Sequence, residues 1–475
     1  MAKSEPKWGT PYQNLTEGVF WSSVTSEPLI NPQWVDWNEG LATQLQLLMN
    51  PQNTELLSAF SGGRPLRQWR PCAQVYSGHQ FGQWAGQLGD GRGVCLGVSS
   101  SSFGSYEWHL KGAGRTPYSR SGDGRSVLRS AIREYLGSEY MHSLGVPTTR
   151  ALAIVRSDTL VQRETLETGA TLMRLARSHL RIGHFEHFYH RKAEVELREL
   201  VEFAIEQLDP DISERPDRVE IAFMRYVERS AALVAEWMAV GFVHGVMNTD
   251  NTALSGETLD YGPYSFLTQY NPAYVINHTD HSGRYAFGQQ PRVMHWNLSC
   301  LAETLTPFVA ADRLREILGQ FPDLYLAFYR KSMACRLSIQ IENPKLILLI
   351  ESLKLVGGER GMFYPELFAF LLLDDWQSLS KSLQASSKAK QLKRDWEAEV
   401  DKGSRALART LCPSWMLSHW LLDTVIEYSE GGDDSLVRAL RASIGSGLDT
   451  YSNVVAKHGS SPPDEQSAYH LSCSS

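Results

Sequence analysis

The hydrophobic pattern of this 475-residue chain changes its period near residue 185. Before that point, short runs of β-forming residues alternate with glycine-rich turns, and one helical segment over 126–145 lies among them. Beyond it, apolar residues recur at helical spacing, as over Glu196–Gln207 and Ile221–Val240. The pattern predicts an α+β fold in which a small sheet-plus-helix part precedes a mostly helical part. The predicted strands are Gly93–Val98, Glu107–Lys111, Ala151–Val155 and Ala170–Leu175.

The length exceeds that of a usual single domain, so we expect two lobes. A loop-and-strand segment over His244–Phe266 interrupts the helical pattern, which resumes after His295 and continues to about residue 445. The first 72 residues, rich in Pro, Asn, Gln and Trp, are expected to form an irregular arm packed on the core. The expected division is an arm over 1–72, an N-lobe over 73–184, a helical C-lobe over 185–445 with functional loops at 244–262, and a loosely structured tail over 446–475.

Composition argues against several classes of protein. The formal net charge of −7 argues against nucleic acid as the main ligand, because binding to a phosphate backbone normally needs a basic surplus. The six cysteines are scattered without a CxxC pair, so neither a disulfide framework nor a zinc site is expected. The N-terminus lacks the apolar stretch of a secretory signal, and the densest apolar runs are too short or too interrupted to cross a bilayer. We expect a cytoplasmic protein that binds neither nucleic acid nor membranes.

The segment LGDGRG, residues 88–93, opens one of the predicted strands. Glycines without a Cβ, here Gly89 and Gly91, let backbone N–H groups approach phosphate oxygens, and Arg92 adds positive charge. Taken alone, a glycine-rich segment of this kind is more often a plain hairpin turn. It indicates a phosphate-binding loop only together with the residues that follow it.

Lys111 closes the next predicted strand, and Glu134 follows it on the predicted helix. A lysine at a strand end can reach the phosphates of ATP when a glutamate from the next helix orients it. A solvated lysine and an exposed glutamate are the commoner alternative. The position of both residues after the glycine-rich loop favours an ion pair at a nucleotide site.

Two later loops carry oxygen ligands suited to a hard cation. HGVMNTDN, residues 244–251, follows a long predicted helix, and LDYG, residues 259–262, follows a short β-like run. Kinase-like folds place an Asn and then an Asp-aromatic-Gly on successive loops, where both hold the metal that bridges the phosphates of ATP. Asn251 and Asp260 stand in this order, so we predict that they bind Mg²⁺ or Mn²⁺.

Basic residues gather in two segments near these motifs. Arginines in an acidic protein suit a polyphosphate, because the guanidinium fork matches phosphate oxygens; a solvated charged face is the alternative. The first segment holds Arg174, Arg177 and Arg181, and the second holds Arg115, Arg120, Asp123, Gly124 and Arg125.

Val246 occupies the place at which aminoglycoside-kinase-like sequences have the catalytic Asp of His-Gly-Asp, and a valine cannot accept a proton. Asp250 is the nearest carboxylate. Either Asp250 acts as the base, or the protein is a pseudokinase that only binds nucleotide. The residues by themselves leave both alternatives open.

Several long motifs together resemble the selenoprotein O (SelO) family. They are YSGHQFGQWAGQLGDGRG, WHLKGAG, PYSRSGDGRSVLRSAIRE, SHLRIGHFEHF, HGVMNTDN, LDYGP and the terminal Cys-Ser-Ser. The resemblance runs from about Ala73 to Leu305 and includes the tail. It implies a protein-kinase-like, bilobal fold that binds ATP flipped relative to kinases. The α-phosphate would then face the acceptor, and AMP would pass to Ser, Thr or Tyr hydroxyls of partner proteins.

The resemblance also implies roles for individual residues. It implies that Asp250 is the proton acceptor and that Asn251 and Asp260 bind the metal. A reversed nucleotide would explain Val246, since the usual base position would no longer face the reacting phosphorus. The residues that it places around the nucleotide are Gly89, Gly91, Arg92, Lys111 with its partner Glu134, Asp123, Gly124, Arg174, Arg181 and Asp260.

Cys473 stands third from the end, where some eukaryotic members of the family carry selenocysteine. Some bacterial members pair this cysteine with one that follows the metal-binding Asp. The corresponding segment here, PAYVINH, has Ile276 at that place. Two alternatives remain for Cys473: a bond to a thiol partner such as glutathione, or no role.

The sequence leaves three functions to distinguish: AMP transfer, ordinary transfer of the γ-phosphate, and regulatory nucleotide binding by a pseudokinase. Val246 argues against the second function. The retained Asp250, Asn251 and Asp260 argue against the third, because an inactive site need not keep a base and two metal ligands. UMP transfer from UTP with Mn²⁺ at the same site is a further alternative.

Overall fold

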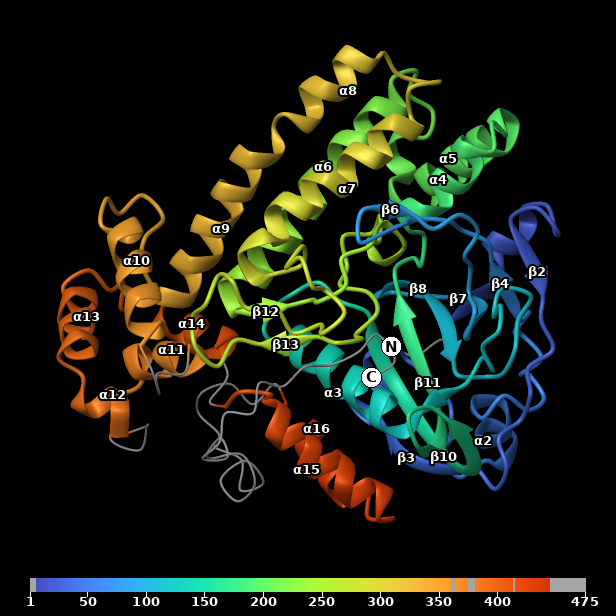
Figure 1. Ribbon diagram of the computed structural model, residues 1–475, viewed down its shortest axis with the longest axis horizontal. Helices are drawn as coiled ribbons and strands as arrows, with labels where there is room; N and C mark the ends of the chain where they lie inside the picture. Colours follow the sequence, from blue (N-terminus) through green and yellow to red (C-terminus); the bar gives the residue numbers. More distant parts are fainter. Residues whose placement is uncertain (1–5, 360–363, 375–380, 413–414, 445–475) are drawn as a thin grey trace.

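A computed structural model of the chain describes residues 6–359, 364–374, 381–412 and 415–444, so the expectations for the tail and for Cys473 lie outside the described residues. Its largest sheet is antiparallel, with the strand order β2-β4-β7-β8-β11-β10-β3; β1 also pairs with β7, and β9 with β11 (Figure 1). The strands of this sheet are β1 (Lys7–Gly9), β2 (Trp21–Ser23), β3 (Gln33–Trp37), β4 (Cys72–Gln74), β7 (Gly93–Ser101), β8 (Gly104–Lys111), β9 (Ser126–Val127), β10 (Arg150–Gln162) and β11 (Leu166–Ala176).

Each strand predicted from the sequence lies within one of the four long strands, β7, β8, β10 and β11. The predicted helix is also present as α3 (Leu128–Ser143). These elements could be recognised because each is long enough to show its own period and is bounded by glycine-rich or polar turns. The mixed α/β character expected from the sequence is therefore confirmed.

Residues 6–72 are more regular than expected, because short strands and helices lie among their loops. β1 pairs with β7, and β3 pairs with β10 at the far end of the sheet, where Asp36 lies opposite Ile154. Two helices, α1 (Glu39–Gln44) and α2 (Thr54–Phe60), follow β3. Strands of three to five residues are too short to show a period of two, and their partners lie far along the chain, so no local pattern could reveal them.

The two faces of the sheet pack against different helices. Successive side chains of a strand point to opposite faces. Val94 and Leu110 join the core cluster that includes α1 and α2, whereas Cys95 joins the cluster built around α3. The first cluster is rich in tryptophan, with the rings of Trp69 and Trp108 6.0 Å apart. Both faces of the sheet are thus covered by helices.

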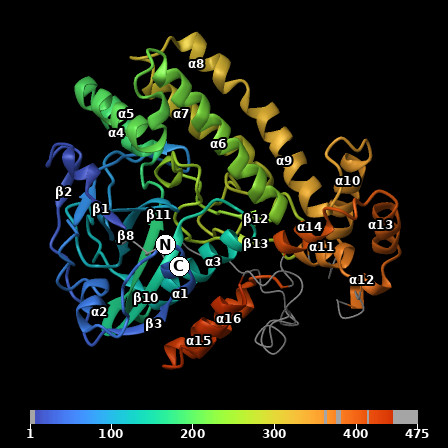
Figure 2. The same ribbon diagram turned by 180° about the vertical axis from the view of Figure 1, so that it is seen from behind.

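Helices dominate the described chain after β11, as expected (Figures 1 and 2). The longest, α6, packs along α9 and also contacts α7 and α8. None of the helices in the described residues is both long and apolar enough to cross a membrane. The helices are α4 (Ile182–His190), α5 (Glu194–Leu208), α6 (Arg218–Val240), α7 (Gln290–Thr304), α8 (Ala311–Leu318), α9 (Phe321–Leu337), α10 (Leu346–Gly357), α11 (Tyr364–Leu372), α12 (Lys381–Ala385), α13 (Ser387–Glu397), α14 (Arg405–Leu411), α15 (His419–Glu430) and α16 (Ser435–Ser443).

Shorter elements lie between the sheet and these helices. Two strands of two residues each, β5 (His79–Gln80) and β6 (Gln83–Trp84), form a hairpin before β7. Later in the chain, β12 (Phe242–Val243) pairs with β13 (Ser265–Phe266). A 3-10 turn, η3 (Thr249–Asn251), lies between β12 and β13. Other 3-10 turns are η1 (Pro11–Asn14), η2 (Pro210–Ile212) and η4 (Phe287–Gln289).

The last two described helices return to the sheet. Both views place α15 and α16 beside α3, and α16 also contacts β3 (Figures 1 and 2). Arg438 donates a hydrogen bond of 2.9 Å to the carbonyl oxygen of Val35, and Arg441 forms an ion pair with Asp36. The segment expected to belong to the C-terminal helical part therefore supports the edge strand of the sheet.

Candidate active site

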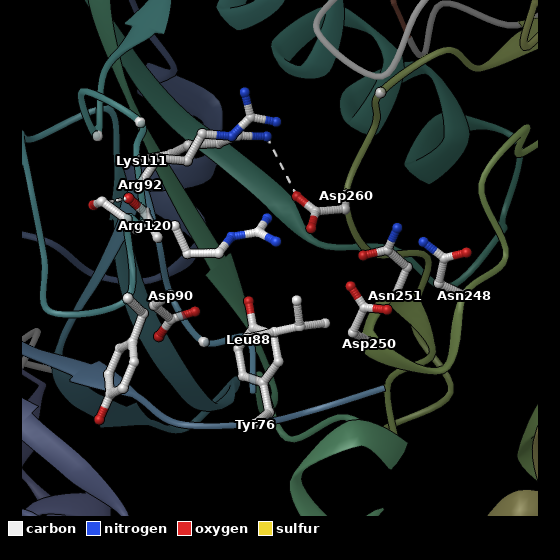
Figure 3. A pocket seen from close by; sticks show the side chains of 18 of the residues that line it. Tyr76, Leu88, Asp90, Arg92, Lys111, Arg120, Asn248, Asp250, Asn251 and Asp260 are labelled. Carbon is white, nitrogen blue, oxygen red and sulfur yellow. Dashed lines mark hydrogen bonds and ion pairs between the residues drawn. The ribbon is translucent and has the colours of Figure 1, made fainter. Parts of the chain in front are cut away.

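A pocket of about 740 Å³ lies where the ends of β7, β8 and β11 face η3 and the segment 259–262. In Figure 3, Arg92, Lys111 and Arg120 extend from one side of this pocket, and Asp250, Asn251 and Asp260 from the other. The predicted site residues that line it are Gly89, Gly91, Arg92, Lys111, Asp123, Gly124, Arg174, Arg181, Asp250, Asn251 and Asp260. The twelfth, Glu134, is buried behind Lys111.

The predicted pair of Lys111 and Glu134 is formed. Lys111 ends β8, between Gly93 of β7 and Leu172 of β11, and its Nζ lies 2.5 Å from Oε2 of Glu134 on α3. The other oxygen of Glu134 accepts a hydrogen bond of 3.1 Å from Arg174. Burial opposes ionisation of Glu134, but the charges of Lys111 and Arg174 hold its pKa below the ordinary value. The carboxylate thus fixes two cationic groups at the pocket wall.

Asp260 lies at the point where three cationic side chains meet. Its Oδ1 is 3.3 Å from Nζ of Lys111 and 2.9 Å from Nη1 of Arg174, and its Oδ2 is 3.3 Å from Nη1 of Arg181. Burial opposes ionisation, yet these charges hold the pKa of Asp260 well below its usual range. The residue has a φ of +64°, a left-handed conformation that non-glycine residues adopt sparingly. The backbone thus adopts this uncommon conformation at the residue whose carboxylate lines the pocket.

Asn251 approaches the same pocket from η3. Its side-chain nitrogen donates to the carbonyl oxygen of Val246 at 3.1 Å, which orients the amide and leaves its oxygen as the end available to a ligand. His244 links the two loops, since its Nε2 donates to the carbonyl oxygen of Leu259 at 3.0 Å. One amide oxygen and one carboxylate suit a hard divalent cation, so the residues present fit Mg²⁺ or Mn²⁺.

Asp250 follows Val246 in the same loop and lines the pocket with it. It is buried, its Oδ2 accepts a hydrogen bond of 3.1 Å from Gln80, and its Oδ1 has no hydrogen-bond partner among the described residues. Burial raises the pKa of Asp250 to about 6, against the opposing effects of Gln80 and Arg181. A carboxylate with a free oxygen and a pKa near neutrality is suited to accept a proton.

The glycines of residues 88–93 are explained first by packing. At Gly89, φ is +135° and a Cβ would lie 2.5 Å from Cγ of Tyr118. At Gly124, φ is +68° and a Cβ would lie 2.0 Å from the carbonyl oxygen of Gly114. Thr116 also donates to the carbonyl oxygen of Asp90 at 2.6 Å. Gly89 thus lets Tyr118 pack against the segment 88–93, and Gly124 lets the chain pass close to Gly114; both glycines line the pocket.

The predicted basic residues do not all behave alike. Arg181 donates to the carbonyl oxygen of Asp250 at 2.8 Å, and its guanidinium carbon lies 4.7 Å from the ring centre of Tyr76. Asp123 is held by Arg163 at 2.7 Å, and this hydrogen bond lowers its pKa. Arg177 is exposed and lies outside the residues that line the pocket, so its expected place there is wrong. Arg115, Arg120 and Arg125 do line the pocket.

Four further residues of the site were not recognised from the sequence. Tyr76, Gln80 and Asp90 precede β7, and Asn248 precedes η3; all four line the pocket. The first three belong to the long motif YSGHQFGQWAGQLGDGRG, so that motif was the available signal. The contact between Gln80 and Asp250 spans 170 residues, and no spacing in the sequence indicates it.

The chain matches one protein family over most of its length. The family model described as protein adenylyltransferase SelO matches residues 7–429, which is most of the chain and extends beyond the motifs between residues 73 and 305. The matched range contains the ion pair of Lys111 and Glu134 and the pocket residues Asp250, Asn251 and Asp260. The chain therefore belongs to the SelO family of protein adenylyltransferases and is a nucleotidyltransferase that uses ATP.

Proposed function

We propose that this pocket binds ATP with a divalent cation and transfers its AMP group to a Ser, Thr or Tyr hydroxyl of a partner protein, with Asp250 as proton acceptor. The observation that carries the proposal is the position of Asp250: its carboxylate lines the same pocket as Lys111, Arg174 and Arg181, and one of its oxygens is free of partners in the described chain.

The charge pattern supports a triphosphate in this pocket. Lys111, Arg174 and Arg181 converge on the single carboxylate of Asp260, and Arg92 adds to the positive potential that Asp260 experiences. Among the described residues, eight cationic side chains line the pocket, against five carboxylates when the four aspartates of the lining and the buried Glu134 are counted together. The surplus of positive charge suits an anionic ligand. Phosphate oxygens provide that charge, and the buried surroundings strengthen the attraction.

Asn251 and Asp260 would hold the divalent cation that accompanies ATP. It would polarise the phosphoryl oxygens and offset the charge that develops on them. Asp260 remains ionised at neutral pH because of its cationic neighbours. Asn251 is kept with its oxygen available by its bond to Val246.

Asp250 supplies the acid–base chemistry. The acceptor hydroxyl loses its proton to the Asp250 carboxylate while its oxygen forms a bond to the α-phosphorus of ATP. The bond between the α-phosphorus and the bridging oxygen of pyrophosphate breaks, and pyrophosphate leaves. Lys111, held by Glu134, and the neighbouring arginines stabilise the charge of the phosphates during this step.

The proposal includes a nucleotide reversed relative to protein kinases and a kinase-like arrangement of two lobes. Val246 supports the reversal, because this buried side chain lines the pocket at the usual base position but cannot accept a proton. The paired Lys111 and Glu134, in the strand β8 and the helix α3, support the kinase-like arrangement. So do the successive loops that carry Asn251 and Asp260.

Labelled ATP tests the direction of transfer. The protein is incubated with Mg²⁺ or Mn²⁺ and with ATP labelled on the α-phosphate or, separately, on the γ-phosphate. We expect label in protein from the α position only. Label from the γ position would mean an ordinary kinase, and nucleotide binding without transfer of either label would mean a pseudokinase; both results contradict the proposal.

Two variants separate the role of Asp250 from general damage. We expect Asp250→Asn to lose transfer of the α-label while ATP binding, measured by calorimetry, persists. Asp312→Asn is the matched control, because this exposed aspartate lies on α8, outside the residues that line the pocket. Full transfer by the Asp250 variant would refute the assignment of the proton acceptor.

A further inference from the structure

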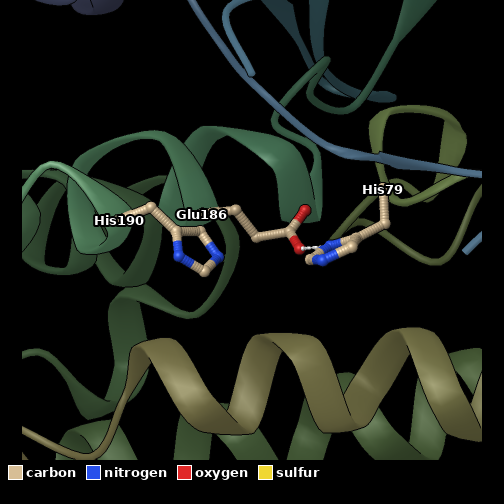
Figure 4. A group of neighbouring side chains, drawn as sticks. All are labelled: His79, Glu186 and His190. Atoms are coloured by element: carbon tan, nitrogen blue, oxygen red, sulfur yellow. Dashed lines mark hydrogen bonds and ion pairs between the residues drawn. The ribbon is translucent and has the colours of Figure 1, made fainter. Parts of the chain in front are cut away.

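Three side chains outside the proposed ATP pocket offer their ligand atoms to one point. His79 lies in the β5–β6 hairpin, and Glu186 and His190 lie on α4, one helical turn apart (Figure 4). One ligand atom from each of the three residues lies within 4.8 Å of the others. Residues four apart on a helix share a face, so α4 presents its carboxylate and imidazole toward the hairpin together. The group has the composition of a cation site.

One carboxylate oxygen of Glu186 lacks a hydrogen-bond partner among the described residues. The residue is 1% exposed, and its Oε1 lies 2.5 Å from Nδ1 of His79. Its Oε2 is buried and has no hydrogen-bond partner among the described residues. A buried carboxylate oxygen left unpaired is costly, and a bound cation would remove that cost.

Aromatic rings enclose the group. The ring of Trp84 lies 4.1 Å from that of His190 and 5.2 Å from that of His79, and the ring of Trp296 lies 5.4 Å from that of His79. These rings reduce the contact of His79 and Glu186 with water, and His190 remains exposed at the end of α4. A partly enclosed group with one exposed ligand allows an ion to enter from solvent.

We propose that His79, Glu186 and His190 form a binding site for Zn²⁺, separate from the pocket for ATP. Two imidazole nitrogens and one carboxylate are a ligand set that Zn²⁺ accepts, with water at the fourth position. Mg²⁺ prefers oxygen ligands alone, so the site discriminates against Mg²⁺, one of the two cations proposed for the ATP pocket. The cysteine pattern gave no reason to expect zinc, and this group contains no cysteine.

The site would join two segments next to Asp250. The backbone N–H of His79 donates to Oγ1 of Thr249 at 2.7 Å, and the adjacent Gln80 donates to Asp250. An ion on His79, Glu186 and His190 therefore fixes the hairpin to α4 and holds Gln80 against Asp250. This consequence depends on the role proposed for Asp250, whereas the binding of Zn²⁺ does not.

Calorimetric titration of the metal-free protein with Zn²⁺ tests the site. Excess Mg²⁺ is present to occupy sites made of oxygen ligands, accessible thiols are alkylated beforehand, and nucleotide is omitted. We expect uptake of one Zn²⁺ per chain at this site. The affinity should fall by more than about 100-fold in His190→Ala and in Glu186→Gln, because loss of a group that only orients a ligand already costs about 10–100-fold.

His281→Ala is the control, because His281 is an exposed histidine outside this group. It should bind Zn²⁺ as the unaltered protein does. His190 is exposed, so His190→Ala should keep the circular dichroism spectrum and the melting temperature of the metal-free protein. Co²⁺ should give the visible absorption of a four-coordinate ion in the unaltered protein and not in His190→Ala.

Two results would overturn the proposal. One is the absence of Zn²⁺ uptake by the unaltered protein. The other is an equal affinity of the unaltered protein and His190→Ala. Because no nucleotide is used, neither result bears on the proposed transfer of AMP.

Discussion

Replacing Asp250 by asparagine should stabilise the protein while removing its base. The pKa of Asp250 is raised from 3.8 to about 6, chiefly by burial. Between these two pKa values, the carboxyl of the folded protein is still protonated, whereas the carboxyl of the unfolded chain is ionised. As the pH rises from below 3.8 to above 6, the folded state loses stability, because the buried carboxylate must ionise. Asparagine has the same shape and carries no charge at any pH, so it avoids that loss.

The magnitude follows from the shift of about two pKa units. At about 1.36 kcal/mol per unit, Asp250→Asn should gain about 3 kcal/mol of unfolding free energy at pH 8. At pH 5 the unfolded carboxyl is mostly ionised and the folded one mostly protonated, so the gain should be about half as large. With an unfolding entropy of about 2.1 cal/mol/K per residue, the gain at pH 8 corresponds to a rise of about 3 °C in Tm if the chain unfolds as one unit.

Thermal unfolding of the nucleotide-free protein at pH 5 and pH 8 measures this gain. Asp312→Asn serves as the control, because its side chain is exposed and lies outside the residues that line the pocket. The reasoning is refuted if Asp250→Asn is no more stable than the unaltered protein at pH 8. It is also refuted if the gain at pH 8 does not exceed the gain at pH 5.

Three other predictions concern the same pocket. The kcat/KM for ATP should rise about tenfold per pH unit up to about pH 6 and then level off as Asp250 ionises; a flat profile between pH 5 and 7 would contradict its role. Asp260→Asn should lower α-label transfer by more than about 100-fold, because a proposed metal ligand loses its charge, and near-normal transfer would exclude that ligand. Gly89→Ala should lower the unfolding free energy by about 1–3 kcal/mol because of its φ and the contact with Tyr118. Gly86→Ala, with a positive φ but open space around its Cβ, should cost less, and equal losses in denaturant titrations would argue against that contact.

Residues that share one local pattern were the predictable part of this protein. The strand that ends at Lys111 and the helix that holds Glu134 each show their own period, so their ion pair could be expected before any coordinates. The loops with Asn251 and Asp260 were recognisable because their residue types follow in a fixed order along the chain.

Contacts between distant segments were not predictable. The short strands β1 and β3 take their places only through partners elsewhere in the chain. Gln80 reaches Asp250 because the β5–β6 hairpin packs against η3, which no spacing reveals. The role of Gly89 was also only partly foreseen: absence of a Cβ suggested approach to phosphate, whereas the structure shows close packing against Tyr118.

The contact of α16 with β3 has a consequence for synthesis on the ribosome. Asp36 and its partner Arg441 are separated by 405 residues, so this edge strand emerges long before the helix that supports it. An exposed strand edge can pair with other chains, and non-local contacts form late in folding. During translation the nascent sheet should therefore be open to aggregation or to chaperone binding until α16 has been synthesised and packs against β3.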